Sequence, residues 1–185
     1  LVGDSAANVV LGYPDTVPVT LDELLVLNRA VRKAVQYAFV IGDMPFGSYN
    51  VSAEQAIVNG TRFMKEAGSD AVKLEGGGVM IDKLRAMTQA GIPVVGHLGL
   101  KPQTARLIGR YRGEGNTAEK AQAMIDDAKA IAAAGAIMLV LECVPGQVAG
   151  KIASLVDIPV IGIGAGPDVD GQVLVLHDML GITQE

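Results

Sequence analysis

Apolar residues along this chain gather into short, nearly continuous runs instead of alternating with polar residues. We expect six of these runs to be strands, covering residues 1–4, 38–43, 71–75, 93–97, 137–142 and 158–163. A continuous apolar run indicates a strand that is buried on both faces, which is typical of parallel strands covered by helices. Helical patterns fill the intervals between the runs, so the sequence predicts an α/β fold.

Signals at the helix boundaries support this alternation. Thr20–Glu23 and Ser52–Gln55 both fit a capping box, in which the first hydroxyl and the fourth side chain each satisfy a backbone N–H group. Thr117 and Pro102 are the residue types expected at the N-cap and the first position of two further helices. Other helical patterns end on an Ala-Gly pair shortly before a strand, and glycine readily adopts the left-handed conformation needed there. The glycines of these pairs are Gly68, Gly91 and Gly135.

Almost every predicted strand ends on a chemically functional side chain. These side chains are Asp4, Asp43, Glu75, His97 and Glu142. In a (β/α)8 barrel the carboxyl ends of all strands converge on one mouth, where the active site lies. The alternative is an open, doubly wound sheet, which usually carries a glycine-rich phosphate turn after one strand and leaves most other strand ends without function. We therefore favour a (β/α)8 TIM barrel.

The length of the chain limits how much of a barrel it can form. The chain has 185 residues and about six predicted strands, whereas a barrel of this type has eight strands and typically about 250 residues. We expect residues 1–185 to form one partial barrel domain that lacks one βα unit at each end.

Charge and composition argue against nucleic-acid and membrane partners. The net charge is −5, basic residues are dispersed among acidic ones, and aromatic residues make up 4% of the chain. A nucleic-acid platform needs a basic face with stacking rings. No stretch of about 18 apolar residues occurs, so no membrane span is expected. Because there is no signal-peptide pattern and only one cysteine, Cys143, we expect a cytoplasmic protein.

Three of the strand-end acids predict a metal site. Asp4, Asp43 and Glu75 would repel one another at one barrel mouth unless a cation lay between them. Mg²⁺ suits this position because it prefers oxygen ligands and leaves coordination sites for water and substrate. Bound to the carboxylate and keto oxygens of an α-keto acid, such an ion stabilises an enolate. Lys73 lies two residues before Glu75, on the same strand face, where it is placed to pair with an anionic substrate.

Enolate chemistry also requires a base, and Glu142 is the candidate, since partial burial at a strand end would raise its pKa into a useful range. His97 is expected to bind substrate, to orient a ligand or to satisfy a backbone carbonyl. His177 is expected to have a structural role in a helix. Cys143 should point away from Glu142 and pack in the interior. The glycine-rich run Gly162–Gly166 is either a wall of the site or a tight turn.

Seven motifs extend this pattern over essentially the whole chain. They are LVGDS, TVPVTLDELL, GDMPFGSY, AVKLEGG, PVVGHLGL with KPQ, LVLECVP, and IPVIGIGAG with DGQVLVLHDMLGI. In this order they closely resemble the ketopantoate hydroxymethyltransferase (3-methyl-2-oxobutanoate hydroxymethyltransferase) family. The resemblance implies a barrel akin to the phosphoenolpyruvate/pyruvate-binding barrels and a homo-oligomer, commonly a decamer. It further implies transfer of a hydroxymethyl group from the co-substrate 5,10-methylenetetrahydrofolate to 3-methyl-2-oxobutanoate, giving 2-dehydropantoate for pantothenate and coenzyme A synthesis.

The same resemblance implies roles for individual residues. Metal ligands fall on Asp4, Asp43 and Glu75, substrate contacts fall on Asp4, Ser5, Asp43 and Lys73, and the proton acceptor falls on Glu142. The chain departs from the family pattern in the segment Gly109–Asn116. There, Arg110 and Arg112 either meet an anionic folate tail or are solvated.

Two other functions remain open from the sequence. One is a different metal-dependent enolate enzyme on the same barrel, such as a lyase or mutase. Isocitrate lyase relatives carry a catalytic cysteine in a KKCGH-type motif, which this chain does not contain. The other is an inactive fragment or assembly subunit of the same family, which would keep the motif residues without turnover.

Overall fold

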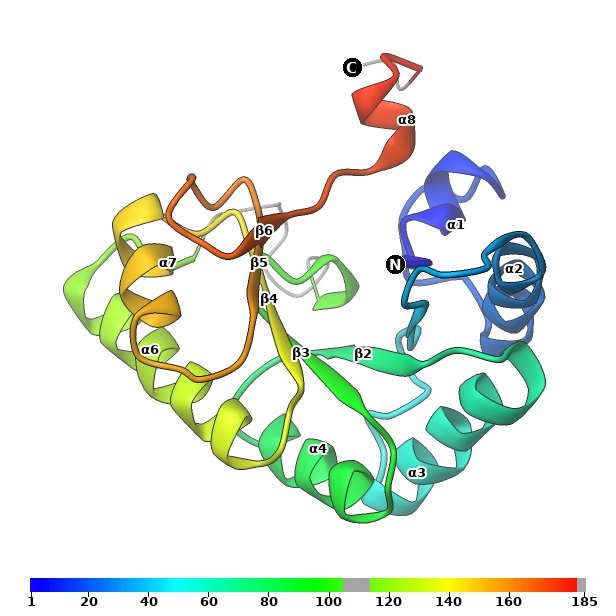
Figure 1. The fold of residues 1–185 in the computed structure, drawn as a ribbon, viewed down its shortest axis with the longest axis horizontal. Helices are drawn as coiled ribbons and strands as arrows, with labels where there is room; N and C mark the ends of the chain where they lie inside the picture. The colour runs from blue at the N-terminus through cyan, green and yellow to red at the C-terminus, as the bar shows by residue number, and fades with distance from the viewer. Residues whose placement is uncertain (105–113, 183–185) are drawn as a thin grey trace.

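The computed structural model describes residues 1–104 and 114–182. Its centre is a curled sheet of six strands that neighbour one another in chain order (Figure 1). All neighbouring strands are parallel. They are β1 (Ile41–Asp43), β2 (Ala71–Glu75), β3 (Val94–Gly99), β4 (Met138–Glu142), β5 (Val160–Ile163) and β6 (Gly171–Gln172). A doubly wound sheet reverses its strand order at a switch point, and the described sheet has no such reversal. The order and curl therefore match part of a barrel.

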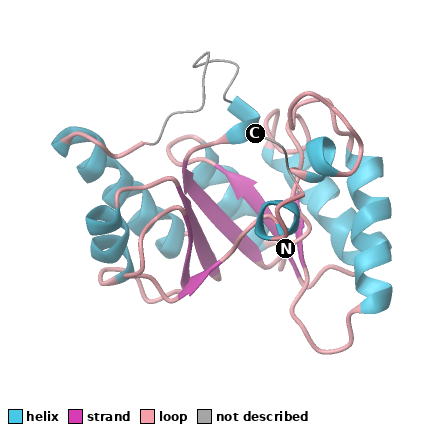
Figure 2. Ribbon diagram, turned by 90° about the horizontal axis from the view of Figure 1, so that it is seen from above, coloured by secondary structure: helices cyan, strands magenta, loops and turns pink. Residues whose placement is uncertain are grey.

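Helices cover the convex, outer face of the sheet, as Figures 1 and 2 show from two directions. The covering helices are α2 (Leu21–Ala34), α3 (Ala53–Arg62) with its π-helical continuation η1 (Phe63–Ala67), α4 (Met80–Gln89), α6 (Ala118–Ala133) and α7 (Gly146–Ala153). Three shorter segments are α1 (Ala6–Val9), the 3₁₀ turn η2 (Pro102–Thr104) and α8 (Leu176–Met179). In the part of the chain that the structure describes, we find no helix with the length and apolar character needed to cross a membrane.

Hydrogen bonds at the starts of α2 and α3 test the two predicted capping boxes. At α2 the box is complete, because Thr20 Oγ1 accepts the Glu23 N–H at 3.2 Å and Glu23 Oε2 accepts the Thr20 N–H at 2.8 Å. At α3 Ser52 Oγ accepts the Gln55 N–H at 3.1 Å. Gln55 Oε1, however, accepts the N–H of Val51. The second half of that box is thus displaced by one residue, while the N-cap itself is confirmed.

The other predicted boundaries are also found. Thr117 caps α6 by accepting the N–H of the residue three positions later, and Pro102 opens η2. The three glycines that follow α4, α6 and η1 adopt positive φ angles of 86°, 94° and 70° at Gly91, Gly135 and Gly68. These angles suit the left-handed region that favours glycine.

Two elements differ from the predicted strands. Residues 1–4 form only a single parallel bridge, from Val2 to Gly42. The chain turns into α1 directly afterwards, where the N–H groups of Ala6 and Ala7 bond to Gly3 and Asp4. Strand β6 was not predicted, because its two residues include no apolar run.

Alternation along the strands divides their side chains between two faces. Outward-facing Leu74 and Leu141 are fully buried in one apolar cluster with helix residues such as Leu84. Burying each such side chain contributes about 1.5–3 kcal/mol. Inward, a second apolar cluster is formed by Ile41, Ala71, Val95 and Val140. The next inward positions on those strands are polar: Asp43, Lys73, His97 and Glu142. The inner face of the sheet is therefore apolar at the amino ends of the strands and carries ionisable side chains at their carboxyl ends.

Candidate active site

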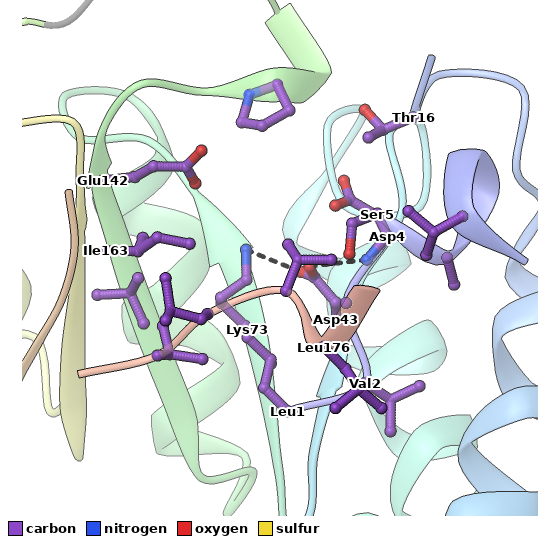
Figure 3. A pocket seen from close by; sticks show the side chains of 18 of the residues that line it. Leu1, Val2, Asp4, Ser5, Thr16, Asp43, Lys73, Glu142, Ile163 and Leu176 are labelled. Carbon is purple, nitrogen blue, oxygen red and sulfur yellow. Dashed lines mark hydrogen bonds and ion pairs between the residues drawn. The ribbon is translucent and has the colours of Figure 1, made fainter. Parts of the chain in front are cut away.

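A pocket of about 380 Å³ opens at the carboxyl ends of the strands (Figure 3). All candidate residues from the sequence contribute to its wall: Asp4, Ser5, Asp43, Lys73, Glu75, His97 and Glu142. Residues 1–6 and 173–177 also line it. The structure therefore brings every predicted site residue to one cavity.

An ion pair between Lys73 and Asp43 is buried in this pocket. Lys73 Nζ lies 2.9 Å from Asp43 Oδ1, and the two side chains are 4% and 2% exposed. The other oxygen, Asp43 Oδ2, accepts the backbone N–H of Asp4 at 3.1 Å. Burial alone lowers the pKa of Lys73, but attraction to Asp43, Glu75 and Asp4 outweighs burial and raises the pKa above its ordinary value. Lys73 is therefore positively charged at neutral pH.

His97 connects this cation to Glu142. Its Nδ1 lies 3.1 Å from Lys73 Nζ, and its Nε2 lies 3.3 Å from Glu142 Oε2. An ammonium group can only donate, so Nδ1 must accept and the ring proton resides on Nε2, facing Glu142. Burial and the charge of Lys73 lower the pKa of His97, which keeps the ring neutral. The ring thus turns its N–H side toward Glu142, whose side chain is 21% exposed at the pocket, and Nε2 forms no hydrogen bond within the described part of the chain.

The two remaining acids have raised pKa values. Burial is the main cause for Asp4, and the charge of Asp43 adds to it, raising the pKa of Asp4 to about 7. Burial likewise raises the pKa of Glu75 well above its ordinary value, although Lys73 opposes this shift. Glu75 Oε1 is buried and forms no hydrogen bond among the described residues. Negative charge in this pocket is therefore incompletely compensated by the protein.

These acids fit a hard divalent cation by their chemistry, because buried carboxylates in excess of nearby cations provide oxygen ligands and negative charge. Within residues 1–104 and 114–182, no three acidic, histidine or cysteine side chains converge closely enough to hold an ion by themselves. A cation here would therefore take one or two carboxylates together with water and substrate, which is the usual mode for Mg²⁺. The predicted ligand set of Asp4, Asp43 and Glu75 stays a prediction.

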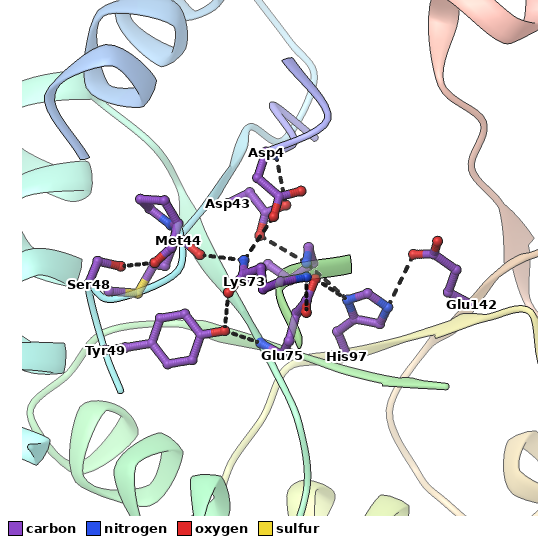
Figure 4. A network of polar contacts seen from close by, with 11 residues as sticks. Asp4, Asp43, Met44, Ser48, Tyr49, Lys73, Glu75, His97 and Glu142 are labelled. Atoms are coloured by element: carbon purple, nitrogen blue, oxygen red, sulfur yellow. Dashed lines mark hydrogen bonds and ion pairs between the residues drawn. The ribbon is translucent and has the colours of Figure 1, made fainter. Parts of the chain in front are cut away.

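Sequence reasoning missed two buried polar residues of the site, Gln103 and Tyr49. Figure 4 labels Tyr49 together with the two acids, Asp4 and Glu75. Gln103 Nε2 donates to Asp4 Oδ2 at 2.9 Å, and Tyr49 OH donates to Gln103 Oε1 at 2.6 Å. Gln103 belongs to η2, four residues beyond the end of β3, so the search for functional groups directly at strand ends passed over it. Tyr49 lies in the loop after β1, where its ring is packed in the main apolar cluster.

Thr16 was also missed. It lines the pocket together with Ser5, and its buried hydroxyl oxygen has no hydrogen-bond partner among the described residues. Thr16 lies in a loop, outside any predicted strand, and the motif TVPVTLDELL, which begins at this residue, was given no role in the site. An unpaired buried hydroxyl in a pocket wall is available to a ligand.

The expectation for Cys143 was wrong. Cys143 is exposed, and its φ angle of 51° shows that the chain has already left the strand, so strand alternation does not apply to it.

His177 lies in a helix as predicted, at the pocket wall. In the run 162–166, Gly162 lies within β5, and Gly164 and Gly166 follow the strand with positive φ angles of 60° and 79°. A Cβ at Gly166 would lie 2.8 Å from the Gly146 Cα atom. Close packing explains that glycine, and the adjacent Ile163 lines the pocket. Arg110 and Arg112 lie outside the described residues.

Comparison with known proteins gives the family. The family model described as ketopantoate hydroxymethyltransferase matches residues 1–185. The chain belongs to this family. Relatives named 3-methyl-2-oxobutanoate hydroxymethyltransferase include one from Campylobacter jejuni strain 81116, which is 52% identical over 185 residues, covering 100% of this chain and 68% of the relative. Another, from Geobacillus kaustophilus, is 52% identical over 181 residues, covering 98% and 65%. The chain thus spans about two thirds of the length of these family members.

Two solved structures illustrate the likeness in fold. Phosphonopyruvate hydrolase, solved in complex with oxalate and Mg²⁺, has a TM-score of 0.70 at 15% identity, covering 97% of this chain and 69% of that protein. The 2,3-dimethylmalate lyase, a member of the PEP mutase/isocitrate lyase superfamily, has a TM-score of 0.62 at 14% identity, covering 97% and 62%. At these identities the likeness shows the fold alone.

Proposed function

We propose that this protein transfers a hydroxymethyl group from 5,10-methylenetetrahydrofolate to 3-methyl-2-oxobutanoate, giving 2-dehydropantoate in pantothenate and coenzyme A biosynthesis. The observation that carries the proposal is the contiguous series Asp43, Lys73, His97 and Glu142 in one pocket, within a chain that belongs to this family. This series places a buried cation and a partly exposed carboxylate in the same cavity. An α-keto acid needs both groups, the first for its charge and the second for its proton.

Asp4, Asp43 and Glu75 are the residues that would hold Mg²⁺ in this proposal. Their carboxylate oxygens and excess negative charge support the assignment, and water and substrate would complete the coordination. When bound, the ion supplies positive charge next to the keto oxygen, where negative charge develops during enolisation. Lys73 supplies a further positive charge that attracts the substrate carboxylate.

Glu142 acts as the base in the proposed reaction. Glu142 lines the pocket, and its Oε2 atom lies 3.3 Å from His97 Nε2. It takes the proton from the branched carbon next to the ketone, and the resulting carbanion forms a C–C bond to the folate methylene carbon as one of the two folate C–N bonds of that carbon breaks. Water then forms the new C–O bond as the second C–N bond breaks. The leaving tetrahydrofolate takes one proton from water and one that came from the substrate. Apolar lining residues such as Val140 and Ile163 reduce the water around the branched substrate carbon.

We further propose that the six strands belong to a (β/α)8 barrel of the phosphoenolpyruvate/pyruvate-binding type and that the protein assembles as a homo-oligomer, with a decamer as the expected form. The strand order, the curl of the sheet and the fold likeness to the PEP mutase/isocitrate lyase superfamily support the barrel. The greater length of the curated relatives leaves room for further βα units.

A product assay distinguishes this function from the alternatives. Protein, Mg²⁺, 3-methyl-2-oxobutanoate and 5,10-methylenetetrahydrofolate are incubated, and 2-dehydropantoate is detected by mass spectrometry. Product that requires both substrates supports the proposal. Cleavage of 2,3-dimethylmalate or phosphonopyruvate without folate chemistry would favour a lyase or hydrolase. A folded protein with neither activity would favour the inactive fragment.

A further inference from the structure

Gln103 contacts both of the buried acids with raised pKa values. The residue is 2% exposed, in η2. Its Nε2 donates to Asp4 Oδ2 and to the Met44 carbonyl oxygen, both at 2.9 Å. Its backbone N–H donates to Glu75 Oε2 at 3.3 Å. One residue thus bonds to two acids that come from different segments, the first before α1 and the second on β2.

The partners fix the orientation of the Gln103 amide. The Met44 carbonyl can only accept, so the NH₂ group must face it and Asp4. The amide oxygen then faces Tyr49, whose O–H must donate to it. The Tyr49 oxygen in turn accepts the backbone N–H of Glu75 at 3.1 Å. Every bond in this network therefore has one consistent direction, which favours a single side-chain geometry.

A neutral donor is the appropriate group between these acids. Asp4 and Glu75 repel each other when both are ionised, so they need a bond that keeps them together. A lysine or arginine in this place would satisfy them but would also oppose the entry of a divalent cation. The Gln103 amide and backbone N–H bind one oxygen of each acid without adding charge. The other Glu75 oxygen, Oε1, has no hydrogen bond among the described residues and is available to a ligand.

We propose that Gln103, held in place by Tyr49, is a positioning residue that sets Asp4 and Glu75 in the arrangement that binds Mg²⁺. The inference rests on the proposed function, because it takes these acids as metal-binding groups. Gln103 itself does not contact the ion or the substrate in this proposal. It acts through the two carboxylates.

The test compares Gln103→Met with the unchanged protein. Methionine keeps the length of the side chain and the backbone N–H but removes the amide. The control is Gln89→Met, since Gln89 is exposed at the end of α4 that precedes β3, opposite the pocket. Mn²⁺ serves as the metal probe, and its binding to the folded protein is measured by electron paramagnetic resonance. We expect Gln103→Met to weaken Mn²⁺ binding about 10-fold or more, Tyr49→Phe to weaken it less, and Gln89→Met to leave it unchanged.

A second readout separates positioning from a purely structural role. Mg²⁺ is titrated while solvent deuterium enters 3-methyl-2-oxobutanoate. Positioning predicts a half-saturating Mg²⁺ concentration about 10-fold higher in Gln103→Met, with a maximal exchange rate that excess Mg²⁺ largely restores. A lower melting temperature with unchanged Mn²⁺ affinity would overturn the positioning role alone. Absence of Mn²⁺ binding by the unchanged protein would overturn the proposed metal function as well, so the two failures are distinct.

Discussion

Asp4 illustrates at the residue scale how burial changes the behaviour of a side chain. Its pKa rises from an ordinary value of 3.8 to about 7, mainly through burial and also through the charge of Asp43. Between these two pH values the folded protein binds a proton that the unfolded chain has released. The free energy of unfolding therefore falls as pH increases from about 4 to about 7, and it falls by up to about 1.4 kcal/mol per pH unit for this one group.

Replacing Asp4 tests whether its raised pKa makes the free energy of unfolding depend on pH. An Asp4→Asn protein cannot release the proton, so its free energy of unfolding should decrease less between pH 4 and pH 7 than that of the unchanged protein. Urea unfolding at several pH values, without divalent cations, measures the difference. The exposed Asp157→Asn variant is a control that should retain the original slope. Parallel pH profiles for all three proteins would contradict the raised pKa of Asp4.

At the scale of single residues, the sequence predicted the acids better than their partners. Asp43, Lys73 and Glu142 follow from the strand period, because an inward position at a strand end can be counted from the apolar run. Gln103 and Thr16 could not be found this way, since loops and short turns carry them into the pocket. Their positions depend on tertiary packing, which the strand period does not record, although Gln103 ends the KPQ motif and Thr16 begins TVPVTLDELL.

Gly99 joins two strands at the site and supports a prediction at the scale of elements. It ends β3 with a φ angle of +98°, and a Cβ there would lie 2.1 Å from the backbone oxygen of Glu142. Gly91 has a similar φ of +86°, but a Cβ there would meet nothing within 4 Å. Alanine at either position should cost about 1–2 kcal/mol for the backbone conformation. Gly99→Ala should cost about 1–3 kcal/mol more and should slow the reaction by moving Glu142.

Thermal unfolding and deuterium exchange into the keto acid measure these two effects. Gly91→Ala is the matched control and should keep the exchange rate. Equal stability losses in the two variants, or a normal exchange rate in Gly99→Ala, would contradict the close approach of β3 to Glu142.

The elements themselves were largely predictable, and the exceptions have physical reasons. Continuous apolar runs marked β2, β3, β4 and β5, because strands buried on both faces require them. The run at residues 1–4 became one bridge at Val2, because the turn into α1 begins at Asp4. Strand β6 is held by pairing with β5 and has no apolar run that marks it in the sequence.

At the scale of the whole molecule, the sheet brings acids that are distant in sequence into one pocket, where they outnumber the basic side chains. The stability of the folded protein should therefore depend on a divalent cation. Mg²⁺ at about 100 times its dissociation constant should add about 2.7 kcal/mol to the free energy of unfolding, which raises the melting temperature by roughly 5–10 °C for a chain of this size. Differential scanning calorimetry measures the shift. Sodium chloride at equal ionic strength is the control, and Asp43→Asn should abolish the shift while Asp157→Asn keeps it. A shift that sodium chloride reproduces would contradict a specific site.

Proton removal from the keto acid is the central claim, and solvent deuterium exchange tests it most directly. Exchange into 3-methyl-2-oxobutanoate is followed by NMR with Mg²⁺ present and folate absent, for the unchanged protein, for Glu142→Gln and for the exposed control Glu119→Gln. We predict loss of the methine proton signal in the unchanged protein and in Glu119→Gln, with a rate at least about 100-fold lower in Glu142→Gln. Exchange that proceeds equally in Glu142→Gln would contradict the role of this carboxylate, and no exchange from a folded, metal-binding protein would contradict the enolate mechanism.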